Sequence, residues 1–197
     1  MTPNKFTLLI VDCQNDYTQK DGSLYIESCD IVIPKICKFM EDNKDHIDRV
    51  ILAKSNHPEN YCIFKGHGGG YPKHCVEKTQ GNKIDNRILK TLKRTKLNYV
   101  ELNHGEVHDF EENSVSKYSR IIDETFVLAT STDACRIMTD DIVLCGVSGD
   151  IMVSETIKDL CKQLKNDNIY LFIDGVASVN KDIIMDILET YDTMNIL

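Results

Sequence analysis

The feature that most constrains the fold of this chain is a series of short, mostly apolar segments, each followed by turn or loop residues. Segments of this length are too short for core helices, whereas a strand buried on both faces shows a continuous apolar run. Five segments have this character and are predicted to be the central strands: Phe6–Val11, Val50–Ala53, Tyr99–Leu102, Ile142–Cys145 and Ile169–Ile173.

The stretches between these segments repeat their apolar residues at helical spacing. Helices are predicted over residues 30–40, 86–97, 153–164 and 183–188. Pro34 falls near the first turn of the first helix, where proline is tolerated. Strands that alternate with helices predict a parallel sheet with helices on both faces, which is a three-layer, Rossmann-like α/β fold. A chain of 197 residues suits a single domain spanning 1–197.

Composition argues against several function classes. The formal net charge of -8 disfavours a nucleic-acid or anionic-membrane surface, since both need clustered Lys and Arg. The apolar run at residues 6–11 is too short for a signal peptide or a membrane span. The eight cysteines show no CxxC spacing. Without a secretory signal, they indicate small core residues or free thiols in a reducing, cytoplasmic environment.

Chemistry is expected at the carboxyl ends of the strands, where parallel α/β sheets bind ligands. Asp12 follows the first predicted strand, and a partly desolvated carboxylate at the sheet rim can act as a general base. Taken alone, this position favours a capping role instead. Two long segments, 56–82 and 105–117, lack periodicity, and loops of this length are usually functional. His57 and His74 lie in the first of them, although their spacing alone favours surface histidines over metal ligands.

Several motifs resemble the nicotinamidase/isochorismatase-like hydrolases. Residues 9–17 (Leu-Ile-Val-Asp-Cys-Gln-Asn-Asp-Tyr) are similar to the strand of that family that ends in Asp-x-Gln-Asn-Asp-Phe. Residues 55–58 (Ser-Asn-His-Pro) and 71–76 (Tyr-Pro-Lys-His-Cys-Val) are similar to its Asp-x-His-Pro and Trp-Pro-x-His-Cys-Val. Residues 146–153 are similar to its Gly-x-Ala-x-Asp-x-Cys-Val, and residues 118–119 match its Tyr-Ser. The motif at 71–76 favours the nicotinamidase branch.

The resemblance implies an isochorismatase-like fold and a role for individual residues. It makes Asp12 the catalytic acid/base. It assigns the positions of Ser55, His57 and His74 to a divalent metal. Backbone N–H groups around residues 147–148 (Val147 and Ser148), in a turn that often contains a cis peptide, would hold the oxyanion.

Three positions depart from the family pattern. The nucleophilic cysteine corresponds to Met152, whose thioether has no ionisable proton and cannot form the usual thioester. The family's lysine corresponds best to His104. The metal-binding aspartate corresponds to Ser55, which lowers the affinity for a divalent cation. We therefore expect Zn or Mn to bind weakly at most.

The resemblance implies a nicotinamidase-like hydrolase, from a family that converts nicotinamide to nicotinate and ammonia in pyridine nucleotide salvage. Since Cys13, Cys75 and Cys145 are expected to be structural, Met152 makes this amidohydrolase activity weak or absent. The chain would then be a pseudoenzyme that binds a small planar molecule such as nicotinamide. Two alternatives stay open: a thiol-free, isochorismatase-type hydrolase in which Asp12 protonates a vinyl ether, and a non-catalytic interaction scaffold, for which a homo-oligomer is possible.

Overall fold

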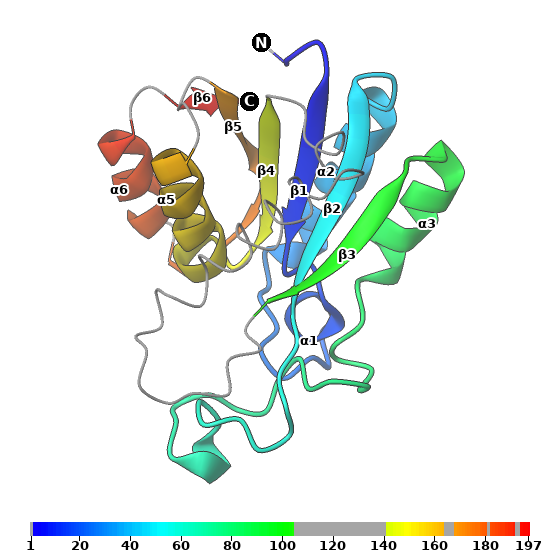
Figure 1. The fold of residues 1–197 in the computed structure, drawn as a ribbon. Helices are drawn as coiled ribbons and strands as arrows, with labels where there is room; N and C mark the ends of the chain where they lie inside the picture. The colour runs from blue at the N-terminus through cyan, green and yellow to red at the C-terminus, as the bar shows by residue number, and fades with distance from the viewer. Residues whose placement is uncertain (1, 105–140, 164–167, 181, 192–193) are drawn as a thin grey trace.

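The computed structural model describes residues 2–104, 141–163, 168–180, 182–191 and 194–197 (Figure 1). Its strands are β1 (Phe6–Val11), β2 (Ile47–Ser55), β3 (Tyr99–His104), β4 (Ile142–Val147), β5 (Ile169–Ala177) and β6 (Asn195–Ile196). Its helices are α1 (Asn15–Thr18), α2 (Cys29–Asp42), α3 (Asn86–Thr95), α5 (Ser154–Gln163) and α6 (Asp182–Thr190), with a 3-10 turn η1 (Lys65–His67) and a π-helical turn η2 (Gly149–Val153).

The strands form one sheet in the order β3-β2-β1-β4-β5-β6, and every neighbouring pair is parallel. The five predicted strands are thereby confirmed, and β6 adds a short edge strand that was not predicted. The order of the strands reverses between β1 and β4. In open α/β sheets, ligands bind beyond the carboxyl ends of the strands at such a reversal.

The sheet is covered on both faces, as the apolar run of β1 predicted. All six residues of β1 are buried. Phe6, Leu8 and Ile10 join a core cluster with residues of α2 and α3, whereas Leu9 and Val11 join a second cluster with residues of α5 and α6. Figure 1 shows these helix pairs on opposite sides of the sheet. The predicted three-layer α/β architecture is therefore confirmed.

The predicted helices are present, with corrected ends. Because α2 begins at Cys29, Pro34 lies in its second turn, inside the helix rather than in its first turn. There its missing N–H removes a helical hydrogen bond. Helix α3 ends two residues before the predicted end at position 97, because Lys96 adopts a left-handed backbone with φ 59°. Over the described residues, none of the helices is long and apolar enough to cross a membrane.

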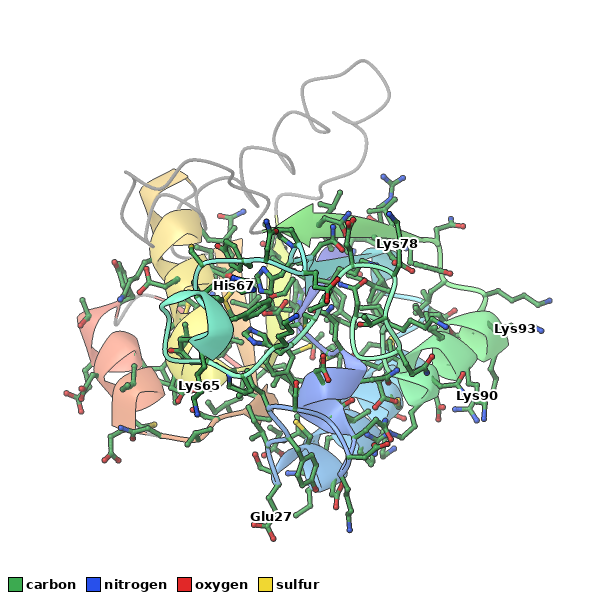
Figure 2. The ribbon with its side chains drawn as sticks, turned by 90° about the horizontal axis from the view of Figure 1, so that it is seen from below. Glu27, Lys65, His67, Lys78, Lys90 and Lys93 are labelled. Atoms are coloured by element: carbon green, nitrogen blue, oxygen red, sulfur yellow. The ribbon has the colours of Figure 1, made fainter. Side chains whose placement is uncertain are left out.

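The predicted long loop at residues 56–82 is present and contains only the short turn η1. It lies beyond the carboxyl ends of the strands in Figure 1, and Figure 2 views it from below, with Lys65 and His67 labelled on η1. The same view labels Lys78 in this loop and Lys90 and Lys93 on α3. The segment 105–117 lies outside the described residues.

Gly146 lets β4 approach β1 closely at the reversal of the strand order. Its φ of 136° is a conformation that residues with a Cβ rarely adopt. A Cβ at this position would also overlap the backbone of Val11. The residue that opens the motif at 146–153 is therefore required by backbone packing.

We expect Gly146→Ala to lower the free energy of unfolding by about 3 kcal/mol, since a strained φ and a backbone overlap act together. Urea denaturation measures this loss. Gly66→Ala is the control, because a Cβ there meets nothing within 4 Å and should change stability by about 0.5 kcal/mol or less. Equal effects of the two substitutions would contradict the assigned role of Gly146.

Candidate functional site at the carboxyl end of the sheet

Asp12 directly follows β1 and is completely buried, with 0% of its surface exposed. Its backbone N–H donates to the Ala53 carbonyl at 2.8 Å, which holds it beside β2. The carboxylate accepts two hydrogen bonds from Ser55: the backbone N–H lies 2.9 Å from Oδ1 and the hydroxyl 3.1 Å from Oδ2. Asp12 was expected to be only partly desolvated at the sheet rim, and it is buried more deeply than that. A carboxylate at this depth depends on fixed donors.

Gln14 and Asn82 fix the backbone of Ser55 on its other side. The Gln14 side chain accepts from the Ser55 N–H at 2.8 Å and donates to the Ser55 carbonyl at 2.8 Å. Asn82 donates to the same carbonyl at 2.9 Å and to the Cys75 carbonyl at 2.9 Å. Sequence reasoning assigned no role to Gln14 or Asn82. The only signal was the presence of Gln14 in the opening motif.

Asp16 ties the 56–82 loop to the end of β1. Its Oδ2 accepts from the Cys75 N–H at 2.6 Å and its Oδ1 from the Ser23 N–H at 3.2 Å. Gly81 packs against this carboxylate so closely that a Cβ would overlap it. The loop that follows β2 is thereby held against the segment that follows β1.

His57 and His74, the predicted metal-binding imidazoles, lie together and both are buried. Their ring centroids are 5.1 Å apart, with the planes near perpendicular. The ring of His57 stacks on Tyr61 at 4.7 Å, and His74 contacts Phe64 edge-on at 5.4 Å. The structure therefore brings these two histidines into one aromatic cluster.

The protonation state of His74 follows from its surroundings. Burial lowers the pKa of His74, although the Pro72 carbonyl and the carboxylates of Asp12 and Asp16 act in the opposite direction. The imidazole is therefore neutral at pH 7. Its Nδ1 lies 2.8 Å from the Pro72 carbonyl, so this nitrogen carries the proton of the neutral ring.

The residues present do not fit a tightly held divalent metal. Ser55 stands at the position of the expected carboxylate, and its hydroxyl donates to Asp12. Two imidazoles and a hydroxyl then lack the anionic ligand that offsets a divalent charge. Within the described part of the chain, no group of three His, Cys, Asp or Glu side chains is arranged to hold a metal ion.

The turn after β4 has the backbone geometry that the resemblance implied. The peptide bond between Val147 and Ser148 is cis. The Ser148 carbonyl accepts from the N–H groups of Ile151 at 3.2 Å and Val153 at 3.1 Å, which starts the π-helical turn. This turn begins at the carboxyl end of β4, the strand beside β1.

Met152 lies within this turn and is 7% exposed. It belongs to the same apolar cluster as Val11, the residue before Asp12. His104 is the last residue of β3 and is in register with Ser55 of β2. That the side chains of Asp12, His104 and Met152 converge stays a prediction. The motif at residues 118–119 lies outside the described residues.

Three cysteines on or near β1 and the 56–82 loop are buried thiols. Cys13, Cys75 and Cys145 are each completely buried. Burial raises the pKa of the Cys13 and Cys145 thiols well above the usual range. Burial, with Asp12 nearby, does the same to the pKa of Cys75. The nucleophile and metal ligand is the thiolate, so the expected structural role of these three residues agrees with their surroundings.

We expect Cys13, Cys75 and Cys145 to resist iodoacetamide at pH 8 in the native protein. Their raised pKa values keep them protonated there, and labelling would need a pH far above the usual thiol range. Peptide mass spectrometry measures the labelling, and the chain unfolded in guanidinium is the control, in which all three should react. Rapid native labelling of Cys75 would instead make it a candidate nucleophile.

Comparison with known proteins identifies what this arrangement resembles. No protein-family model matches the chain. In sequence it is similar to the nicotinamidase of Saccharomyces cerevisiae, with 22% identity over 165 residues, which cover 66% of this chain and 76% of the yeast protein. In structure it is similar to PnC1 from L. infantum in complex with nicotinate, with a TM-score of 0.75, 22% identity and coverage of 100% of this chain and 94% of that one. It is also similar to the pyrazinamidase of Pyrococcus horikoshii in complex with zinc, with a TM-score of 0.67, 21% identity and 99% coverage of both chains.

These comparisons confirm the resemblance to nicotinamidases and the isochorismatase-like α/β fold that the motifs implied. At identities of 21% and 22%, the structural likeness shows the fold alone. Roles for individual residues have to come from their own chemistry.

Proposed function

We propose that this nicotinamidase-like chain binds a small planar molecule such as nicotinamide at the carboxyl ends of β1 and β4, and that it hydrolyses the amide weakly or not at all. The observation that carries this proposal is that a buried, hydrogen-bonded Asp12 occurs in a chain with a thioether at position 152. The acid/base is kept, whereas the covalent step has lost its nucleophile. The complex of a structurally similar protein with nicotinate supports the class of ligand.

The proposed chemistry divides between two strands. Asp12 could take a proton from, or give one to, a bound molecule, since it is a fixed carboxylate in a dry environment. The backbone N–H groups after the Val147–Ser148 peptide could stabilise a developing negative charge on a carbonyl oxygen. Met152 cannot lose a proton and cannot carry an acyl group as a neutral thioether. Amide hydrolysis would then have no covalent intermediate.

For the metal, we propose weak binding of Zn or Mn at most. A zinc complex is known for a structurally similar pyrazinamidase. In this chain, His57 and His74 occur without the carboxylate that should accompany them, because position 55 is serine. No step of the proposed chemistry therefore uses a metal.

The main alternative is hydrolysis without a thiol. The thioether at position 152 favours it, because this chemistry needs no thiol nucleophile. A protonated Asp12 could donate its proton to the carbon of a vinyl ether. Water would add to the resulting cation and give up a proton to Asp12, which forms a hemiketal. The hemiketal would then separate into a carbonyl compound and an alcohol. A purely structural scaffold is favoured less, since it would not need a buried carboxylate.

We also propose a cellular compartment and a domain organisation. The seven cysteines described by the structure are all free thiols, which suits a reducing compartment such as the cytoplasm. The structurally similar proteins align with 99% to 100% of this chain, which supports one domain spanning 1–197. A homo-oligomer stays a proposal for sedimentation or light scattering to test.

Nicotinamide hydrolysis by the unmodified protein should be close to undetectable, whereas Met152→Cys combined with His104→Lys should restore it. An enzyme without its nucleophile retains roughly a 10³–10⁴-fold enhancement over water in the well-studied serine case. Met152→Cys alone should restore little, because His104 gives the thiolate weak support. The double variant should exceed the sum of the single variants, since the residues act as a unit. Ammonia release from nicotinamide and pyrazinamide, with Zn²⁺ or Mn²⁺ added, measures these rates.

The control for this rescue is Asp12→Asn in the double variant, which should abolish the restored activity. Robust ammonia release by the unmodified protein would contradict the proposed loss of amide hydrolysis. An absent or additive rescue would mean that the site has been reshaped, and would favour the scaffold. Calorimetric titration with nicotinamide and nicotinate tests the binding itself, and failure to bind either would contradict the proposed ligand.

A further inference from the structure

Ser55 directs its side chain at the carboxylate of Asp12. The residue ends β2 and is 3% exposed. Its hydroxyl lies 3.1 Å from Oδ2 of Asp12, and its own N–H lies 2.9 Å from Oδ1. One residue therefore binds both oxygens of the carboxylate, which fixes the plane of the group as well as its position.

The backbone of Ser55 is itself held from two directions. Both its N–H and its carbonyl are bonded to the Gln14 side chain, at 2.8 Å each. The carbonyl also accepts from Asn82 at 2.9 Å. Ser55 therefore has little freedom to move away from Asp12, and its hydroxyl is presented from a rigid strand end.

A carboxylate at position 55 would need a nearby cation, whereas a serine does not. A second carboxylate at position 55 would lie beside that of Asp12. Two carboxylates within hydrogen-bond distance do not both ionise without a nearby cation. The neighbouring cation on β2, Lys54, pairs with Glu101 at 3.0 Å. A serine avoids the repulsion and contributes a donor in its place.

The two imidazoles beyond Ser55 are held by contacts of their own. His57 stacks on Tyr61, and His74 binds the Pro72 carbonyl and contacts Phe64 edge-on. These contacts place the two rings beside each other. The two histidines that would bind a metal are thus present as a packed cluster. At the position of the anionic ligand, Ser55 donates a hydrogen bond to Asp12.

We propose that Ser55 is a positioning residue. It orients the carboxylate of Asp12 toward the bound molecule, so that the site is assembled without a metal ion. This inference rests on the proposed function, because it takes Asp12 as the group that meets the bound molecule. It assigns to Ser55 a role opposite to that of a ligand: the residue binds the acid/base and not a cation.

The first experiment measures nicotinate affinity by calorimetric titration in Ser55→Ala and Ser55→Thr. Loss of a hydrogen bond to a charged group should weaken binding by roughly tenfold in the alanine variant, and the threonine hydroxyl should restore it. In an Asp12→Asn background, Ser55→Ala should have little further effect, because the serine acts through the aspartate. Unchanged affinity in Ser55→Ala, or full additivity with Asp12→Asn, would overturn the positioning role.

The second experiment needs no organic ligand, and so it remains decisive if nicotinate does not bind. Ser55→Asp should lower the melting temperature, equimolar Zn²⁺ should restore it, and adding Asp12→Asn should also restore much of it by removing the repulsion. Ser55→Asn, similar in size but neutral, should show no zinc response, and neither should the unmodified protein. Stoichiometric zinc in the unmodified protein that is lost in Ser55→Ala would make Ser55 a ligand. A Ser55→Asp variant whose stability depends on neither zinc nor residue 12 would refute the contact between the two positions.

Failure of the two experiments would have different meanings. If the unmodified protein binds neither nicotinamide nor nicotinate, the proposed function is wrong, and the zinc experiment still decides what Ser55 contacts. If nicotinate binds with equal affinity to the unmodified protein and Ser55→Ala, the function stands and the positioning role is wrong.

Discussion

The hydrogen bonding of the buried Asp12 carboxylate is the interaction on which the rest of the site depends. A charged group that is fully removed from water needs donors held in place by the fold. Ser55 supplies two of them, and Gln14 and Asn82 then hold Ser55. Because Asn82 lies at the far end of the 56–82 loop, the requirement of one carboxylate also orders the loop that covers it. The polar network and the loop are thus consequences of the same burial.

The central sheet could be predicted from the sequence because its strands carry their own signal. A strand covered on both faces must be apolar at every position, as nearly all of β1 is. The two-residue strand β6 and the four-residue helix α1 were not predicted, since segments so short have no period to detect. Pro34 was expected in the first turn of its helix and lies in the second, because α2 begins earlier than predicted. No side-chain hydrogen bond caps the start of this helix. Helix boundaries depend on local backbone geometry that apolar spacing does not encode.

The candidate site was predictable only as a set of residues. Hydrogen bonds join Asp12 to Ser55, and the ring of His57 lies beside that of His74; that the four residues form one site stays a prediction. Their partners could not be read from the sequence, because a hydroxyl that donates to a carboxylate and one that binds a metal have the same residue type. Ring packing of His57 and His74 is likewise a property of the folded loop. The sequence therefore indicated which residues to examine, and the structure shows which groups they contact.

The turn around Met152 does not depend on the chemistry of the side chain at position 152. The turn around it is defined by backbone groups, the cis peptide after Val147 and the carbonyl of Ser148, and none of these needs a thiol. The side chain itself belongs to the apolar cluster that contains Val11, so it contributes to the core on the α5 side of the sheet. A thioether interacts favourably with aromatic rings but cannot form a thioester. With a carboxylate after β1 and a polarisable sulfur after β4, the proposed role of this end of the sheet is to bind a flat ring and not to attack it covalently.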